Sequence, residues 1–237
     1  MKILFDVEYR SDSSYQLLLR FCGLSFKLPD PFDKHRDEQA ITRRMAGVKA
    51  QVKDLLDAGW EVYAADEVRL EHEAETRRMW LPKGQRTKLY VDRKKTSQSF
   101  FGALSLTSKK VKLYPIEGNQ NTEQTILALD RLQRETREEK IAVVLDNARF
   151  HHAKMLTCLH EPGQLLERIT PIHLPPYAPD HNPVEHVWNT AKNNIANIQR
   201  ETPEETFGAF ASHITGRTFD HDFEHLPPRD TENDLVS

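Results

Sequence analysis

The chain has no apolar run that approaches the roughly 20 residues of a membrane-spanning helix. A secretory signal is also missing, because the opening Met1-Lys2-Ile3-Leu4-Phe5 meets Asp6 and Glu8 too early. The two cysteines, Cys22 and Cys158, provide neither a disulfide framework nor a four-ligand zinc pattern. The sequence therefore predicts a protein of the reducing cytoplasm with no membrane partner.

Glycine-rich phosphate-binding loops are absent from the sequence as well, so no nucleotide cofactor is expected. No internal repeat or low-complexity tract is visible. The 237 residues, 38% apolar and 29% charged, suffice for one packed catalytic domain and a small appendage. Two large domains would need a longer chain.

Charge is unevenly distributed around the net value of −3. The segment from Arg77 to Lys95 contains eight basic residues and one acid, whereas the segment from Gly216 to the end contains six acids and two arginines. The basic stretch is either a solvated hairpin or a phosphate-contacting surface, and its charge alone does not decide between them. The candidates for phosphate contacts are Lys83, Arg86, Arg93, Lys94 and Lys95.

The first part of the chain predicts half of a helix-plus-wing module. Asp12 or Ser13 caps a short helical pattern that stops at Gly23, and an extended piece follows over 24–28. We assign 1–36 to this remnant and its linker, 37–215 to a catalytic domain that opens with a long helix, and 216–237 to an acidic tail that is mobile or lies over the surface.

Apolar spacing predicts the elements of the catalytic domain. Helices are expected over 37–58, from 122 to about 139, around 153–159 and from 183 to about 198, and strands over 60–65, 99–106, 111–115, 141–145 and 169–174. In the second helix, the expected buried stripe is Ile126, Leu127, Leu129 and Leu132. The predicted elements begin with strands and continue with alternating helices and strands. This order indicates an α/β fold with a mixed sheet covered by helices on both faces.

Three acids stand at ends of these elements. Asp66 and Asp146 each follow an apolar strand, and Glu185 falls in the first turn of a helix. Acids on separate elements can meet at one divalent-metal site for phosphodiester chemistry. Each also has a structural explanation, because Asp146 can cap a helix and acids are favoured in first turns. Glu67 competes with Asp66, but adjacent strand side chains point to opposite faces, and we choose Asp66.

The proline-rich approach to Glu185 is the most specific motif. Asn182 supplies a helix cap and Pro183 the first helical position, so the helix entry is fixed and Glu185 lies near the positive end of the helix dipole. Trp188 is interpreted as core packing. His151 and His152 either contact DNA or orient a metal ligand, although surface histidines that do neither are commoner.

These motifs resemble a known family. Asp146-Asn147 with a histidine soon after, and the segment LPPYAPDHNPVEHVW over 174–188, resemble the second and third acidic motifs of the Tc/mariner superfamily of transposases. Within it, the prokaryotic insertion-sequence six-thirty group is the most similar branch. Asp66-Glu67 matches the first motif, and Trp80-Leu81-Pro82-Lys83-Gly84 resembles the segment that follows it. The resemblance extends from about residue 13 to residue 198.

The resemblance implies an RNase H-like fold and a metal-dependent transposase that cuts DNA at element ends and transfers the strands into target DNA. Asp66, Asp146 and Glu185 would be its catalytic triad and would bind two magnesium or manganese ions. The implied partners are DNA, as terminal inverted repeats and target, and a second copy in a homodimer. The implied location is the prokaryotic cytoplasm, in association with the nucleoid.

The sequence departs from the family pattern in three places. Val68 stands where serine or threonine is usual, and His181 replaces the customary leucine, but neither change removes a ligand. Family members carry a complete N-terminal DNA-binding region, so this chain is expected to be the downstream product of a split reading frame or a truncated copy. A non-catalytic or domesticated DNA-binding remnant, or a generic nuclease of the same fold, are the alternative functions.

Overall fold

The computed structural model describes residues 11–25, 34–148, 151 and 153–224. The chain forms two compact units, Met1–Lys34 and His35–Ser237. The described part of the first unit contains α2 (Asp12–Phe21), whose N-cap is Ser11 rather than the predicted Asp12 or Ser13, because the Ser11 side chain accepts the backbone N–H of Ser14. The helix stops at Gly23, which has a φ of 74°, as predicted. Most of the predicted extended piece lies outside the described residues.

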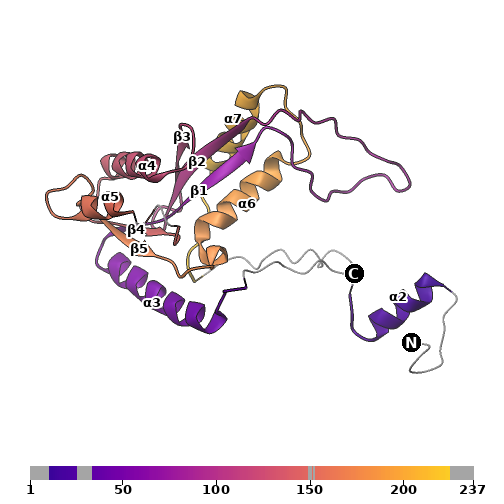
Figure 1. The fold of residues 1–237 in the computed structure, drawn as a ribbon, viewed down its shortest axis with the longest axis horizontal. Helices are drawn as coiled ribbons and strands as arrows, with labels where there is room; N and C mark the ends of the chain where they lie inside the picture. The colour runs from indigo at the N-terminus through magenta and orange to yellow at the C-terminus, as the bar shows by residue number, and fades with distance from the viewer. Residues whose placement is uncertain (1–10, 26–33, 149–150, 152, 225–237) are drawn as a thin grey trace. The chain divides into compact units, whose positions relative to one another are not determined.

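The second unit contains a mixed sheet, which confirms the predicted class. Within the described residues it has five strands, β1 (Glu61–Glu71), β2 (Ser97–Ser105), β3 (Val111–Ile116), β4 (Ile141–Leu145) and β5 (Ile169–His173), in the order β3-β2-β1-β4-β5 (Figure 1). The first three strands are antiparallel, and β4 and β5 run parallel to β1. Because β1 continues to Glu71, Asp66 lies in its middle and not at its end as predicted.

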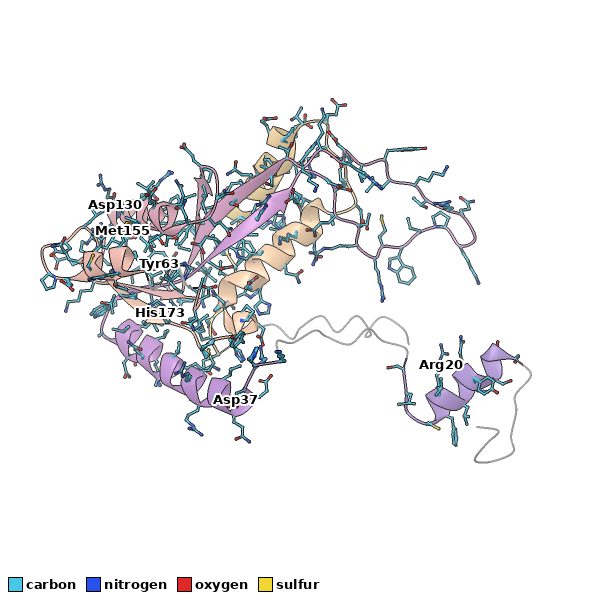
Figure 2. All side chains as sticks on the ribbon, viewed as in Figure 1. Arg20, Asp37, Tyr63, Asp130, Met155 and His173 are labelled. Carbon is cyan, nitrogen blue, oxygen red and sulfur yellow. The ribbon has the colours of Figure 1, made fainter. Side chains whose placement is uncertain are left out.

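Helices cover both faces of this sheet. They are α3 (Glu38–Asp57), α4 (Thr122–Glu135), the short α5 (Lys154–Thr157) and η2 (Cys158–His160), η3 (Pro179–His181), α6 (Pro183–Ile195) and α7 (Pro203–Thr215). Leu129 and Leu132 of α4 and Leu156 of α5 belong to one apolar cluster with the sheet. Residues of α3, α6 and α7 form the clusters on the opposite face. Figure 2 shows side chains filling the space between the layers.

Two predictions about the helices were wrong. Leu127 is 61% exposed, because α4 turns this position to solvent, and α4 ends at Glu135, four residues early. The helix α7 was not predicted, although Thr202 caps it and Pro203 occupies its first turn. Phe210 and Ile214 of α7 are fully buried against α6 and the sheet.

Alternation along β1 determines which side chains face which helices. Tyr63 and Ala65 belong to the α4 cluster, and Val62 and Ala64 to the α3 cluster. Val68 and Leu70 continue on the α6 side. Asp66 therefore lies on the α6 face of the sheet, and Glu67 lies on the α4 face.

The segment 73–96 between β1 and β2, here called the basic arm, projects away from the sheet (Figure 1). All of it is described, and it contains neither helix nor strand. Gln199 holds its two ends together, because its Oε1 accepts the N–H of Ala74 at 3.0 Å and that of Asp92 at 3.2 Å. Trp80 and Tyr90 on the arm are 89% and 82% exposed.

The start of the acidic segment packs onto the second unit. Phe219 and Phe223 are buried in the α6/α7 and α3 clusters, respectively, and Lys109 pairs with Asp222 at 3.2 Å. Residues 225–237 lie outside the described part. Among the described residues, no helix has the length and apolar character needed to span a membrane.

Candidate active site

Asp66 is positioned by Trp188 of α6. The indole Nε1–H of Trp188 donates to Asp66 Oδ2 at 3.0 Å, while the ring is buried against the sheet. The ring lies over Gly102, which pairs with Asp66 in the sheet, and a Cβ at Gly102 would overlap it. The missing side chain of Gly102 thus makes room for the indole that holds Asp66. Trp188 is core packing, as predicted, and it also contacts the acid.

Glu185 is positioned by the capped start of α6. The side-chain Oδ1 of Asn182 accepts the N–H of Val184 at 3.4 Å, and its carbonyl accepts the N–H of Glu185 at 3.1 Å. The Nδ2 of the buried Asn182 donates to the carbonyl of Ala65 at 3.1 Å. One side chain therefore caps the helix and attaches it to β1, directly beside Asp66. This cap and the first-turn position of Glu185 are as predicted.

The proline-rich turn is attached to the start of α3 through Arg36. Its guanidinium donates to both carboxylate oxygens of Asp180, at 2.7 and 3.1 Å, and to the carbonyl of Tyr177 at 2.7 Å. Tyr177 has a φ of 60°, in the left-handed region. The Arg36 side chain is only 7% exposed, and the hydrogen bond to Asp180 raises its pKa further above its already high value. This bidentate contact fixes the approach to α6.

Asp146 follows β4 and is held by two donors on the same oxygen. Its Oδ1 accepts the N–H of Ala148 at 2.9 Å and lies 2.7 Å from Nδ1 of His151. His151 is 1% exposed, so of the alternatives left open by the sequence, that of an uninvolved surface histidine does not apply to this residue. His152 lies outside the described residues.

Glu67 approaches the same histidine from β1. Its Oε1 lies 3.4 Å from His151 Nε2 and accepts the hydroxyl of Thr125 at 3.1 Å. The Glu67 side chain is 4% exposed. In the sequence, Glu67 is the alternative to Asp66 as the metal-binding acid of this strand. In the structure, both residues lie next to the site, on opposite faces of the strand.

The three acids share one electrostatic environment. Burial raises the pKa of Asp66 well above its usual range, and the charges of Glu185, Glu67 and Asp146 raise it further. Burial also raises the pKa of Glu185, with a contribution from Asp146. The pKa of Asp146 is lowered, because the hydrogen bonds from His151 and Ala148 outweigh the effect of burial. Asp66 on β1, Glu185 on α6 and Asp146 after β4 are therefore near enough for the charge of one acid to affect the pKa of another.

His151 carries the compensating charge in this cluster. Burial alone would disfavour its charged form, but its contacts with Asp146 and Glu67 raise its pKa to about 10. The imidazole is consequently protonated at neutral pH and donates from both nitrogens. It offsets the charges of Asp146 and Glu67, whereas Asp66 and Glu185 repel one another.

The donor set fits a hard divalent cation. Carboxylate oxygens are the preferred ligands of magnesium and manganese, and a cation would relieve the repulsion that raises the pKa of Asp66. Within the described residues, no three His, Cys, Asp or Glu side chains already stand in an arrangement that could hold a metal ion.

An open groove leads to Asp146. It is lined by residues 146–148 and by residues 174–179 of the proline-rich turn. The five basic candidates, Lys83, Arg86, Arg93, Lys94 and Lys95, are exposed on the basic arm. Lys83 and Arg86 stand in its projecting part, whereas residues 93–95 follow the contact of Asp92 with Gln199 and shortly precede β2.

One family model matches the chain. A family model described as DDE superfamily endonuclease matches residues 61–206, a segment that contains all three acids. Comparison with curated proteins found no match.

Solved structures similar to the chain include three of Mos1. The Mos1 strand transfer complex has a TM-score of 0.61 and 16% identity, covering 89% of this chain and 64% of that one. The Mos1 transposase paired-end complex with left transposon end has a TM-score of 0.62 and 16% identity, covering 89% and 65%. The Mos1 mariner paired end complex with Mn has a TM-score of 0.61 and 16% identity, covering 88% and 64%. The chain thus spans slightly less than two thirds of these chains.

The likeness in fold confirms the expected RNase H-like arrangement, with its mixed sheet between layers of helices. The family match extends from β1 to the first turn of α7 and covers more than half of the chain. The chain belongs to the DDE superfamily endonuclease family.

Proposed function

We propose that the protein is a transposase that cuts DNA at the ends of a mobile element and joins the freed strands to target DNA. The observation that carries the proposal is the convergence of Asp66, Asp146 and Glu185, from three elements, inside the segment that matches an endonuclease family. The similar structures of Mos1 include a strand transfer complex, a paired-end complex, and paired-end complexes with Mn and with Mg.

Asp66, Asp146 and Glu185 are the residues that would hold the divalent ions, two magnesium or manganese ions on this proposal. Such ions, when bound, polarise the phosphate and lower the pKa of a bound water or hydroxyl. The chain's own contribution is orientation. Trp188 fixes one oxygen of Asp66, and the N–H of Ala148 and the imidazole of His151 fix one oxygen of Asp146.

Substrate positioning is assigned to the groove and the basic arm. The groove is open and is lined by Asp146, and on this proposal a DNA strand would enter it. Lys83, Arg86, Arg93, Lys94 and Lys95 would contact phosphates, since exposed cations on a projecting segment bind a polyanion without sequence selectivity. Binding of two element ends further requires a second copy, so the active form on this proposal is at least a homodimer.

We further propose a family group, a cellular location and a division of the chain into domains. The chain would belong to the prokaryotic insertion-sequence six-thirty group, and it would act in the cytoplasm in association with the nucleoid. Residues 1–36 would be a DNA-binding remnant with its linker, 37–215 the catalytic domain and 216–237 a tail.

A non-catalytic DNA-binding protein is the second candidate. It is favoured by the exposed cations of the basic arm, which would bind DNA whether or not the acids hold a metal. It is opposed by Asp66, a buried carboxylate whose pKa is raised by burial and further by neighbouring acids, as is common at functional sites.

One assay separates these functions. The purified protein is incubated with Mg²⁺, a plasmid target and labelled duplexes that carry the inverted repeats flanking its gene. The proposal predicts cleavage at the repeat end and covalent transfer of the label to the plasmid. Cutting without end specificity or joining would indicate a generic nuclease, and binding without cutting would indicate the non-catalytic alternative.

A further inference from the structure

Glu67 is a buried carboxylate on the face of β1 opposite to Asp66. Its side chain is 4% exposed and lies beside the apolar cluster under α4. Burying an ionised carboxylate is costly unless hydrogen bonds or opposite charge compensate it. The compensating groups here are the hydroxyl of Thr125, at 3.1 Å, and the imidazole of His151, at 3.4 Å from the same oxygen.

His151 extends this contact to Asp146. Its Nδ1 lies 2.7 Å from Asp146 Oδ1, while its Nε2 faces Glu67, so both ring nitrogens are engaged. A ring held at both nitrogens cannot turn without losing a contact. The N–H of Ala148 reaches the same Asp146 oxygen at 2.9 Å. The Asp146 carboxylate is therefore oriented through its Oδ1.

We propose that Glu67 and His151 are positioning residues: Glu67, held to α4 by Thr125, fixes His151, and His151 fixes the carboxylate of Asp146 in the orientation that binds metal. The inference rests on the proposed function, since it takes Asp146 as a metal-binding acid. Adjacent residues of β1 would thus serve one site from both faces of the sheet. Asp66 would act directly, and Glu67 would act through His151.

Partners of metal-binding side chains typically contribute about 10- to 100-fold to metal affinity or activity, because they hold the ligand in its bound orientation. A purely structural Glu67 would instead join β1 to α4 and affect only folding. Metal affinity of the folded, DNA-free protein distinguishes these roles, because a structural contact does not change it once the folded fraction is accounted for.

The variants Glu67→Leu and His151→Ala remove the two contacts. Glu67→Gln keeps an oxygen for His151, and His151→Asn keeps a nitrogen donor near the position of Nδ1. Glu61→Leu is the matched control, because Glu61 is a buried glutamate on the same strand and face and accepts the Ser105 hydroxyl at 2.5 Å. It lies six residues from Glu67, about 20 Å along the strand.

Mn²⁺ binding to each DNA-free variant is measured by electron paramagnetic resonance, together with thermal unfolding and single-turnover cleavage. We expect Glu67→Leu and His151→Ala each to weaken Mn²⁺ binding by about tenfold or more, and the conservative variants to recover most of it. Glu61→Leu should lower the melting temperature alone. In the His151→Ala background, Glu67→Leu should cause no further loss of affinity, because Glu67 acts through the ring.

The inference would be overturned if folded Glu67→Leu and His151→Ala both bound Mn²⁺ with wild-type affinity. It would also be overturned if the losses of Mn²⁺ affinity in the two single variants added up in the double variant. If Glu67→Leu does not fold, the comparison of His151→Ala with His151→Asn decides, since both leave Glu67 in place. Failure of the proposed function is distinguishable, because the wild-type protein itself would then neither bind Mn²⁺ nor cut DNA.

Discussion

The indole nitrogen of Trp188 donates a hydrogen bond to Oδ2 of Asp66 at 3.0 Å, which joins α6 to the middle of β1. The same ring is 2% exposed and packs over Gly102 and against Phe210. One residue therefore belongs both to the core and to the candidate site. Mutations that keep its packing but remove its donor can separate the two roles.

Trp188→Phe keeps an aromatic ring over Gly102 and removes the donor to Asp66. We expect a loss of about 1 kcal/mol in the free energy of unfolding. The cleavage rate should fall by about tenfold, as for other residues that orient a metal ligand. Urea unfolding and single-turnover cleavage measure the two effects. Trp60→Phe, a partly buried tryptophan beside the α3 cluster, is the control and should retain the rate. A wild-type rate in Trp188→Phe would show that the hydrogen bond does not position Asp66.

Asn182→Ala removes both the cap of α6 and the bond to the Ala65 carbonyl. We expect the free energy of unfolding to fall by about 2 kcal/mol, with one part from each contact. Cleavage should fall beyond the loss of folded protein, because Glu185 lies in the released first turn. Thr202→Ala removes only the cap of α7 and should cost about 1 kcal/mol with cleavage unchanged. Equal cleavage losses in the two variants would contradict this account of Asn182.

Asp66→Asn removes a charge but keeps an oxygen for the Trp188 donor. The folded-state pKa of Asp66 is raised by burial and by the neighbouring acids, so its ionised form destabilises the fold at neutral pH. Stability of the wild-type protein should therefore rise as the pH falls through this raised pKa. In EDTA at pH 7, Asp66→Asn should be more stable by about 1 kcal/mol or more.

Mg²⁺ should stabilise the wild-type protein and leave Asp66→Asn nearly unchanged, because the metal favours the ionised triad. Thermal unfolding with Mg²⁺ or EDTA measures both effects. The exposed Asp54 of α3 supplies the control Asp54→Asn, which should follow the wild type. Destabilisation by Asp66→Asn in EDTA would refute the claim of mutual repulsion.

Replacement of the five candidate cations of the basic arm by glutamine should weaken DNA binding and flatten its salt dependence. Each phosphate contact contributes about 0.9 to the slope of log affinity against log salt, so the loss approaches 4 to 5 if all five make contact. Fluorescence anisotropy at several salt concentrations measures the slope. The control is a variant in which glutamine replaces Arg43, Arg44 and Lys53, which are exposed on α3. An unchanged slope in the arm variant would remove these residues from the interface.

The apolar spacing of the sequence predicted most of the fold. The strand of Asp66 was predicted too short, because Glu67, Arg69 and Glu71 alternate with Val68 and Leu70 and hide the continuing buried face. The helix α7 was missed although its Thr202-Pro203 start is a recognisable signal. Leu127 faces solvent since a helix of this length buries only one stripe.

Only part of the candidate site could be predicted from the sequence. The three acids and the cap at Asn182 stand in motifs of local sequence, whereas the contacts that orient them join distant positions. Glu67 and His151 are separated by 84 residues, and Arg36 and Asp180 by 144. No periodicity or spacing predicts such pairs, because they depend on how β1, α3 and the loop after β4 pack together.

The most direct measurement of the central claim is single-turnover cleavage of terminal-repeat DNA by the wild-type protein, Asp146→Asn and Glu185→Gln, in Mg²⁺ and in EDTA. Circular dichroism establishes that each variant is folded. The account predicts that only the wild-type protein cuts, that EDTA abolishes the cutting, and that both folded variants are inactive. Full cleavage by either variant would contradict the assignment of these acids as the metal-binding centre.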